Sequence, residues 1–158
     1  MKIAVITISD SVANGTRQDG SGAALVARCQ QLNWTIISTH LLPDESAQIQ
    51  LLLRQLADGN AVDLILTTGG TGLGPRDSTP EATQAVADRL IPGIPEEMRR
   101  KGIEHTPRAI LSRGVAAIRG NTLILNLPGS PKGAVESLDA VAALLPHCIQ
   151  IVHGARHD

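Results

Sequence analysis

Apolar residues in this chain fall into two alternating patterns. Short continuous apolar runs, such as Ile3 to Ile8 and Val62 to Thr68, are typical of strands that are buried on both faces of a sheet. Between such runs, apolar positions recur with the period of a helix, as they do at Leu25, Cys29 and Leu32. Strands that alternate with helices predict an α/β fold with a mainly parallel sheet.

The same patterns place the individual elements. Strands are expected over residues 3–8, 34–42, 62–68, 115–118 and 122–127. Helices are expected from residue 20, over 44–57, over 79–90, in two short segments before Arg113, and over 131–145. The last two strands are joined by Arg119-Gly120-Asn121, which predicts a hairpin-like pair and a partly mixed sheet. We therefore expect one domain spanning residues 1–158, built as a three-layer sandwich with helices flanking the sheet.

Composition narrows the classes of partner. The chain has no Phe, no Tyr and a single Trp, and its net charge is −1. It therefore lacks both the aromatic stacking platforms and the basic field with which proteins bind nucleic acids. No stretch is long and apolar enough to span a bilayer, and the N-terminal run is too short for a signal peptide. Cys29 and Cys148 form no CxxC pair, which favours a reducing, cytoplasmic setting. Taken together, these features predict a cytoplasmic protein that binds neither nucleic acid nor membranes.

The segment from Thr67 to Glu81 carries the strongest chemical signal. It leaves an apolar strand, contains four glycines and enters a helix, where Thr79 suits the N-cap and Pro80 the first helical position. Glycines let backbone N–H groups approach a ligand, and the start of a helix favours an anion. The pattern predicts a phosphate site, and the alternative is a tight turn without a ligand. Neither a GxxxxGKS/T motif nor a GxGxxG after the first strand occurs, so a P-loop and a Rossmann site are not indicated.

The segment from Asn126 to Gly133 repeats this arrangement at the end of another strand. Ser130 is the expected N-cap, Pro131 the first helical residue, and Lys132 a cation beside the exposed N–H groups. An ordinary helix start with a solvated lysine explains the segment equally well. Ligands of open α/β sheets bind outside the carboxyl edge of the sheet, so two such loops at that edge favour a shared site.

Two aspartates indicate what kind of phosphate site this is. Asp77 lies in the glycine-rich loop, where a bare carboxylate would repel a phosphate, and Asp44 follows the second predicted strand at the same edge. Mg²⁺ resolves this conflict, because it accepts one or two carboxylates and completes its octahedron with phosphate oxygens and water. The alternative for Asp44 is capping of the helix that follows it. Asp10 and Asp19, in the first loop, are weaker candidates of the same type.

Two further groups of polar residues do not predict a binding site. Arg99, Arg100 and Lys101 form a short basic run that is typical of a solvated helix face, and the alternative is that they line the entrance to the substrate site. His153 and His157 are four residues apart, but the short polar tail offers no third ligand, and a metal site is not expected there.

Six short motifs are spread over nearly the whole chain. They are Gly69-Gly70-Thr71-Gly72, Pro75-Arg76-Asp77-Ser78-Thr79-Pro80-Glu81, Leu127-Pro128-Gly129-Ser130-Pro131-Lys132, Ile8-Ser9-Asp10, Leu42-Pro43-Asp44-Glu45 and Ile110-Leu111-Ser112-Arg113. Together they resemble the MogA/MoaB group of molybdenum cofactor biosynthesis proteins. The resemblance implies adenylyl transfer from ATP to the terminal phosphate of molybdopterin, with Mg²⁺ as cofactor. It also implies a homotrimer and a hand-over of the product to a molybdotransferase.

The resemblance further implies roles for individual residues. Asp44 and Asp77 would be both the catalytic acids and the metal ligands. The nucleotide would contact Gly69, Gly70, Thr71, Gly72, Asp77 and Thr79, and the substrate site would involve Ser9, Asp10, Ser112, Pro128, Gly129, Ser130 and Lys132. An attacking phosphate is already anionic and needs no general base, so catalysis would rest on positioning and on neutralisation of charge.

One position departs from the family pattern. Many relatives have Arg after the Ser-Asp pair of the first loop, whereas this chain has Ser11, which weakens the expectation of an anion contact there. Some members of the group lack an acid at the position of Asp44, and its presence here favours activity. Two alternatives remain: a carrier that binds molybdopterin without catalysis, and a nucleotide-processing hydrolase similar to the competence-damage proteins.

Overall fold

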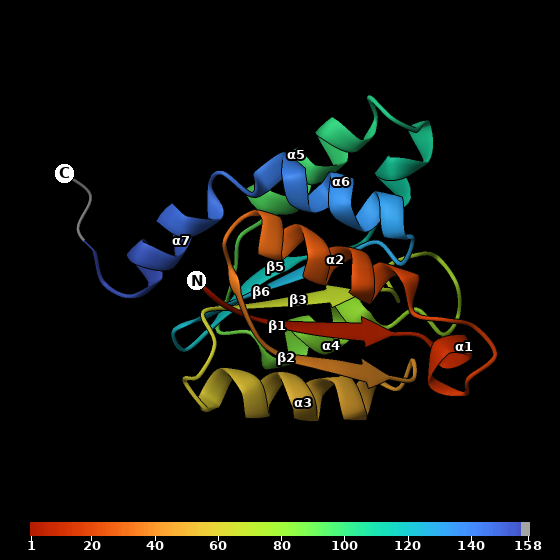
Figure 1. Cartoon of the computed structure of the whole chain (residues 1–158), viewed down its shortest axis with the longest axis horizontal. Coiled ribbons are helices and arrows are strands. Elements are labelled where there is room, and N and C mark those ends of the chain that lie inside the picture. The colour runs from red at the N-terminus through yellow and green to blue at the C-terminus, as the bar shows by residue number, and fades with distance from the viewer. Residues whose placement is uncertain (156–158) are drawn as a thin grey trace.

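A six-stranded sheet in the order β2-β1-β3-β6-β5-β4 forms the central layer of the molecule (Figure 1). The computed structural model describes residues 1–155. The strands are β1 (Lys2–Ile8), β2 (Thr35–Leu42), β3 (Leu64–Thr68), β4 (Arg89–Leu90), β5 (Ala116–Arg119) and β6 (Thr122–Leu127). Strands β2, β1, β3 and β6 run parallel, and β5 is antiparallel to both of its neighbours. The predicted mainly parallel, partly mixed sheet is confirmed.

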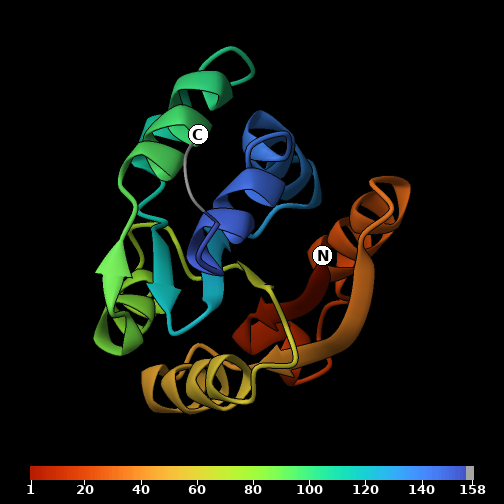
Figure 2. The ribbon, with the colours of Figure 1, turned by 90° about the vertical axis from the view of Figure 1, so that its left-hand side faces the viewer.

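Helices cover both faces of this sheet (Figures 1 and 2). One face carries α2 (Gly20–Gln31), α5 (Gly93–Gly102), α6 (Pro131–Val141) and α7 (Leu145–Val152). The other face carries α3 (Ser46–Asp58) and α4 (Thr79–Val86). Two short elements, α1 (Asp10–Ala13) and the 3-10 helix η1 (Pro107–Leu111), lie in the connections. The predicted three-layer sandwich is therefore confirmed.

Alternate residues of β1 belong to two separate hydrophobic cores, which explains the continuous apolar run in the sequence. Ile3 and Val5 belong to the core beneath α2, α5 and α6, whereas Ile6 and Ile8 pack with α3 and α4. Cys29 lies in the first core, and burial raises the pKa of its thiol to about 11. The thiol stays protonated at neutral pH and acts as a small apolar side chain.

The helix predicted over residues 131–145 is confirmed over Pro131–Val141 and is four residues too long, and a second helix that was not predicted follows it. Helix α6 ends at Val141, α7 begins at Leu145, and the pair is bent by 64°. Pro146 is the physical reason, since a proline lacks the N–H of a helix interior and clashes with the carbonyl group four residues earlier. Within residues 1–155 no single helix has the length and composition of a membrane span, and only this bent pair meets both criteria jointly.

The helix predicted over residues 79–90 is four residues too long. Helix α4 ends at Val86, and Leu90 lies in β4, where it pairs with Ala117 of β5. At the other end, Thr79 is the first helical residue instead of the N-cap, and Ser78 precedes it without a capping hydrogen bond. His157 lies outside the described residues.

Four parallel strands end at one edge of the sheet, and this edge positions the candidate site. Strand β1 is followed by Ser9-Asp10, β2 by Pro43-Asp44, β3 by the loop from Gly69 to Ser78, and β6 by Pro128-Gly129. The chain leaves β1 for β2 on one side and returns to β3 on the other, so the connections diverge beside β1. Ligands of open α/β sheets bind at such a point.

Candidate active site

Two adjoining cavities open at this edge of the sheet. The larger has a volume of about 450 Å³ and the smaller about 300 Å³. Gly70, Asp77, Gly129 and Ser130 line both cavities, so the loops after β3 and β6 form a shared wall. The structure thus brings together the two loops that the sequence presents as phosphate sites.

Close packing explains the first two glycines of the loop after β3. Gly69 and Gly70 have φ angles of 103° and 66°, in the left-handed region that favours glycine. A Cβ atom on Gly69 would lie 2.1 Å from the carbonyl oxygen of Ile8. A Cβ atom on Gly70 would lie 2.2 Å from Thr79 Oγ1 and 3.1 Å from Asp44 Oδ1. Glycine is required here for the loop to pass against the end of β1 and against Asp44.

The side chain of Thr79 holds this loop from within the protein. It is fully buried, and its hydroxyl donates a hydrogen bond of 2.9 Å to the carbonyl oxygen of Gly69. Thr79 lines neither cavity, so the structure does not bring this residue to the predicted nucleotide site. Thr71 and Gly72, which the resemblance assigns to the nucleotide, line the larger cavity and not the smaller one.

Arg113 ties the same loop from the other side. Its Nε donates to the carbonyl oxygen of Gly72 at 2.7 Å, its Nη2 donates to that of Asp77 at 2.8 Å, and its Nη1 pairs with Glu81 of α4. Its backbone N–H donates to the carbonyl oxygen of Thr71 at 2.9 Å. The sequence did not single out this arginine, although it ends one of the motifs shared with the family. The available signal was the motif, since the contacts span more than thirty residues of chain.

Asp44 and Asp77 both line the smaller cavity, as the magnesium hypothesis requires. Asp77 Oδ2 accepts a hydrogen bond from Gly74 N at 2.8 Å, and Asp44 Oδ2 accepts one from Asp10 N at 2.9 Å. Burial raises the pKa of Asp44, and the negative charges of Asp10 and Asp77 add to this effect. The alternative that Asp44 caps the helix that follows it is wrong. Helix α3 begins at Ser46, and the carboxylate of Asp44 accepts its hydrogen bond from the backbone of Asp10, at the start of α1.

The donor set of these two aspartates fits Mg²⁺. In residues 1–155, Oδ1 of each carboxylate accepts no hydrogen bond, so each side chain keeps one oxygen for a cation. No group of three or more His, Cys, Asp or Glu side chains in this part of the chain is placed to hold a metal. Two carboxylates are nevertheless sufficient for Mg²⁺, which takes its remaining ligands from phosphate and water.

Asp10 is held away from both cavities. Its Oδ1 accepts from Asp44 N at 3.0 Å, and both of its carboxylate oxygens accept hydrogen bonds from Arg76. These bonds to the Arg76 guanidinium hold the pKa of Asp10 below its usual value. The structure therefore does not place Asp10 in the substrate site. The other candidate of the first loop, Asp19, caps α2 through Gly22 N at 2.8 Å.

Ser9 and Arg17 are the residues that the first loop presents to the smaller cavity. Ser9 Oγ caps α1 and also accepts a long hydrogen bond of 3.4 Å from Arg17 Nη2. Ser11 Oγ lies 3.1 Å from Ser9 Oγ and supplies no charge. A cation is thus present in this loop, six residues after the position where relatives have Arg, and sequence reasoning missed it.

The larger cavity has a partly apolar wall that comes from α5 and η1. Pro95, Met98 and Leu111 line it, together with the predicted Ser112. Arg99 also lines this cavity and donates to the carbonyl oxygens of Ser112 at 3.2 Å and of Gly114 at 3.4 Å. The interpretation of Arg99 as part of a solvated basic face is therefore wrong.

The other two residues of the basic run behave as predicted. Arg100 and Lys101 form ion pairs with Glu97 and Glu104 on the exposed side of α5. The run of three cations is thus divided between a cavity and the solvent, which the residue types alone could not indicate.

The loop after β6 starts α6 as the sequence predicts. Ser130 is the N-cap and accepts a hydrogen bond from Gly133 N at 3.2 Å. Pro128, Gly129 and Ser130 line the cavities. Lys132 does not, because its side chain is 83% exposed and lies 3.7 Å from Glu136. The structure does not bring Lys132 to the substrate site.

Comparisons with known proteins agree with this geometry. Residues 4–147 match the family described as "Probable molybdopterin binding domain". The chain is 40% identical to a molybdopterin adenylyltransferase of Haemophilus influenzae, over all of this chain and 87% of that protein. It is 42% identical to the Escherichia coli protein of the same name, over 98% and 86%. Among solved structures, the molybdopterin biosynthesis enzyme MoaB of Thermus thermophilus superposes with a TM-score of 0.92 at 49% identity, covering 99% of each chain.

Proposed function

The chain belongs to the molybdopterin-binding domain family, and from this membership we propose that it transfers AMP from ATP to the terminal phosphate of molybdopterin. Relatives that are about 40% identical over the full chain are molybdopterin adenylyltransferases. The observation that carries the proposal is the meeting of Asp44 and Asp77 beside the glycine-rich loop in one cavity.

In the proposed reaction, an oxygen of the terminal phosphate of molybdopterin attacks the α-phosphorus of ATP. The bond from this phosphorus to the bridging oxygen breaks, and pyrophosphate leaves with the electron pair. The attacking phosphate is already anionic, so the protein does not need to remove a proton. What it must supply is in-line positioning and neutralisation of negative charge.

The smaller cavity is suited to the phosphates of ATP. The backbone of Gly69 and Gly70 is exposed to it without a side chain, and Arg17 adds a positive charge. Asp44 and Asp77 would hold Mg²⁺, which supplies neutralisation of charge at the transferred phosphate when it is bound. This arrangement explains why two carboxylates can line a cavity for a polyanion.

The larger cavity is suited to the ring system of molybdopterin. Pro95, Met98 and Leu111 provide apolar surface for the fused rings, and Ser112 and Glu136 provide polar groups for their heteroatoms. Because the two cavities share the wall at Asp77 and Ser130, substrates bound in both would meet there.

The direct test is product formation by the purified protein. Incubation with molybdopterin, Mg²⁺ and ATP labelled at the α-phosphate should give labelled molybdopterin and an equal amount of pyrophosphate. Mass spectrometry should find molybdopterin heavier by one AMP group. Absence of this product under conditions where both substrates bind would overturn the proposal.

The same samples separate the two alternatives. A carrier would bind molybdopterin in isothermal titration without ATP or Mg²⁺ and would release no pyrophosphate. A hydrolase would consume ATP at the same rate with and without molybdopterin.

The remaining expectations rest on the resemblance and extend the proposal. We propose a cytoplasmic homotrimer that passes its product to a molybdotransferase. Light scattering after size-exclusion chromatography would measure the oligomeric state, and a monomer at micromolar concentration would contradict the trimer.

A further inference from the structure

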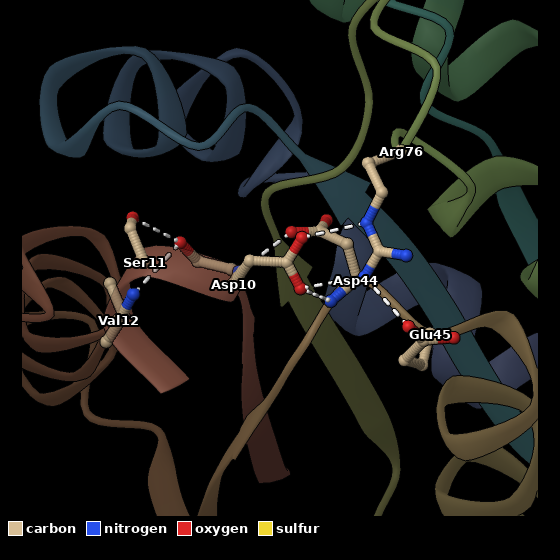
Figure 3. A network of polar contacts seen from close by, with 7 residues as sticks. Asp10, Ser11, Val12, Asp44, Glu45 and Arg76 are labelled. Atoms are coloured by element: carbon tan, nitrogen blue, oxygen red, sulfur yellow. Dashed lines mark hydrogen bonds and ion pairs between the residues drawn. The ribbon is translucent and has the colours of Figure 1, made fainter. Parts of the chain in front are cut away.

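The guanidinium group of Arg76 connects three of the loops at the carboxyl edge of the sheet (Figure 3). Its Nε donates to Asp10 Oδ2 at 2.9 Å, and its Nη2 donates to Asp10 Oδ1 at 3.0 Å. The same Nη2 donates to Glu45 Oε1 at 2.8 Å. Arg76 comes from the loop after β3, Asp10 follows β1, and Glu45 follows β2.

Asp10 in turn holds Asp44 through two reciprocal hydrogen bonds. Asp44 N donates to Asp10 Oδ1 at 3.0 Å, and Asp10 N donates to Asp44 Oδ2 at 2.9 Å. Each residue thus fixes the backbone and side chain of the other. Since Arg76 binds both oxygens of Asp10, the guanidinium group limits the rotation of the carboxylate that anchors the backbone of Asp44.

The two aspartates that line the smaller cavity come from different loops, and Arg76 is the residue next to one of them. Asp77 follows Arg76 directly, whereas Asp44 lies after β2. A cation shared by two carboxylates needs a fixed separation between them. The contacts of Arg76 set the loop that carries Asp77 in register with the loop that carries Asp44.

We propose that Arg76 is a positioning residue that holds Asp44 opposite Asp77 by way of Asp10, and thereby sets the affinity of the cavity for the divalent cation. The inference rests on the proposed function. Arg76 itself lines neither cavity, and its Nε and Nη2 donors are occupied by carboxylates. Its contribution is therefore indirect, through the geometry of Asp44.

The exposure of the network separates positioning from stability. The Arg76 side chain is 55% exposed, and its partners Asp10 and Glu45 are 41% and 49% exposed. Ion pairs of this kind contribute little to the free energy of unfolding. Loss of Arg76 should therefore change cation binding much more than it changes the melting temperature.

The test compares Arg76→Gln and Arg76→Lys with the wild-type full-length chain. Mn²⁺ binding is measured by electron paramagnetic resonance in the presence of α,β-methylene-ATP, together with the Mg²⁺ concentration that gives half-maximal pyrophosphate release. We expect the glutamine variant to bind Mn²⁺ about 10-fold more weakly, as for loss of other groups that orient a metal ligand. The lysine variant should fall in between, because an ammonium group cannot bridge both carboxylates with paired hydrogen bonds.

Arg100→Gln is the matched control. Arg100 makes an exposed paired contact with Glu97 at 2.6 and 2.7 Å, and it is 61% exposed, but it lies on the solvated side of α5. This variant should bind Mn²⁺ like the wild type. Unchanged Mn²⁺ affinity in Arg76→Gln, or an affinity that falls only in proportion to a lower melting temperature, would overturn the inference. If the wild type binds Mn²⁺ and nucleotide yet forms no product, the proposed function fails while the binding comparison still decides the role of Arg76.

Discussion

The loops after β3 and β6 look alike in the sequence but are built differently. Both leave a parallel strand and enter a helix near a proline. In the loop after β3, the distant Arg113 binds three carbonyl oxygens with side-chain and backbone donors, and Thr79, the first residue of α4, binds a fourth. The loop after β6 is held by its own helix cap, through Ser130 and Gly133, and by one distant side chain, since the hydroxyl of Thr68 in β3 donates to the carbonyl oxygen of Pro128 at 2.7 Å.

The two loops also differ in what they place at the cavities. The first loop has two glycines at positive φ, places Asp77 beside Asp44 and depends on distant residues for its shape. The second contributes Pro128, Gly129 and Ser130 to the cavity and leaves its one cation in the solvent. Substitutions in the two loops should therefore have unequal effects.

The largest effect is expected from Asp77→Asn. This change keeps the shape of the side chain but removes the charge that would hold Mg²⁺, and we expect kcat to fall by about 10²- to 10³-fold, as for loss of one transition-state donor. The measurement is Mg²⁺-dependent pyrophosphate release with saturating substrates. Turnover equal to that of the wild type would remove the metal role from Asp77.

A glycine substitution tests the packing of the first loop. In Gly69→Ala the new Cβ meets the carbonyl oxygen of Ile8 at 2.1 Å, in addition to strain from the positive φ. We expect a loss of about 2–4 kcal/mol in the free energy of unfolding, measured by urea denaturation.

Two matched controls separate steric conflict from backbone strain. Gly120→Ala has a φ of 53° but meets nothing within 4 Å, so it should lose only about 1–2 kcal/mol. Gly133→Ala, in the first turn of α6, meets the hydroxyl of Ser130 at 2.6 Å and otherwise only Pro128 at ordinary contact distance, so it should lose about 1 kcal/mol, the usual cost of a weakened helix cap. Equal losses at Gly69 and Gly120 would show that the contact with Ile8 is unimportant.

Removing the charge of Asp44 should have a smaller effect, and it should stabilise the fold where the glycine substitutions destabilise it. Its pKa is raised in the folded chain, so the ionised carboxylate destabilises the fold once the pH exceeds its ordinary value of 3.8. Without divalent cations at pH 7, Asp44→Asn should melt about 1–3 °C above the wild type while losing activity. The difference should shrink as the pH falls through the raised pKa and vanish below 3.8. A wild type that melts higher at pH 7 without Mg²⁺ would contradict this.

The smallest effect is expected from Lys132→Gln. The ammonium group is exposed and its pairing with Glu136 at 3.7 Å is weak, so stability should change by less than about 0.5 kcal/mol. The KM for molybdopterin should change less than threefold, equivalent to about 0.6 kcal/mol. A much larger rise in KM would bring Lys132 back into the substrate site.

The sequence was sufficient for features that depend on local pattern. The buried strands, the carboxyl edge and the meeting of Asp44 with Asp77 follow from apolar runs that end in polar loops. The direction in which individual side chains point could not be predicted from this pattern. Lys132 and Arg99 are both cations near a predicted site, and the structure exposes the first and turns the second to the cavity.

Long-range contacts were also beyond the sequence. Arg76 and Asp10 are 66 residues apart, and no periodic pattern links them. The earlier end of the last predicted helix was indicated by Pro146, because this proline directly follows Leu145 and disfavours a helix that continues through the preceding turn.

The shared wall between the two cavities has a kinetic consequence. ATP and molybdopterin arrive as separate molecules, but the product is one molecule that would lie in both cavities and cross at Asp77 and Ser130. Each half of a linked ligand keeps the other at a high effective concentration, so the pair leaves more slowly than either part. If release of the finished nucleotide is slower than its synthesis, a receiving protein that draws it out would accelerate turnover.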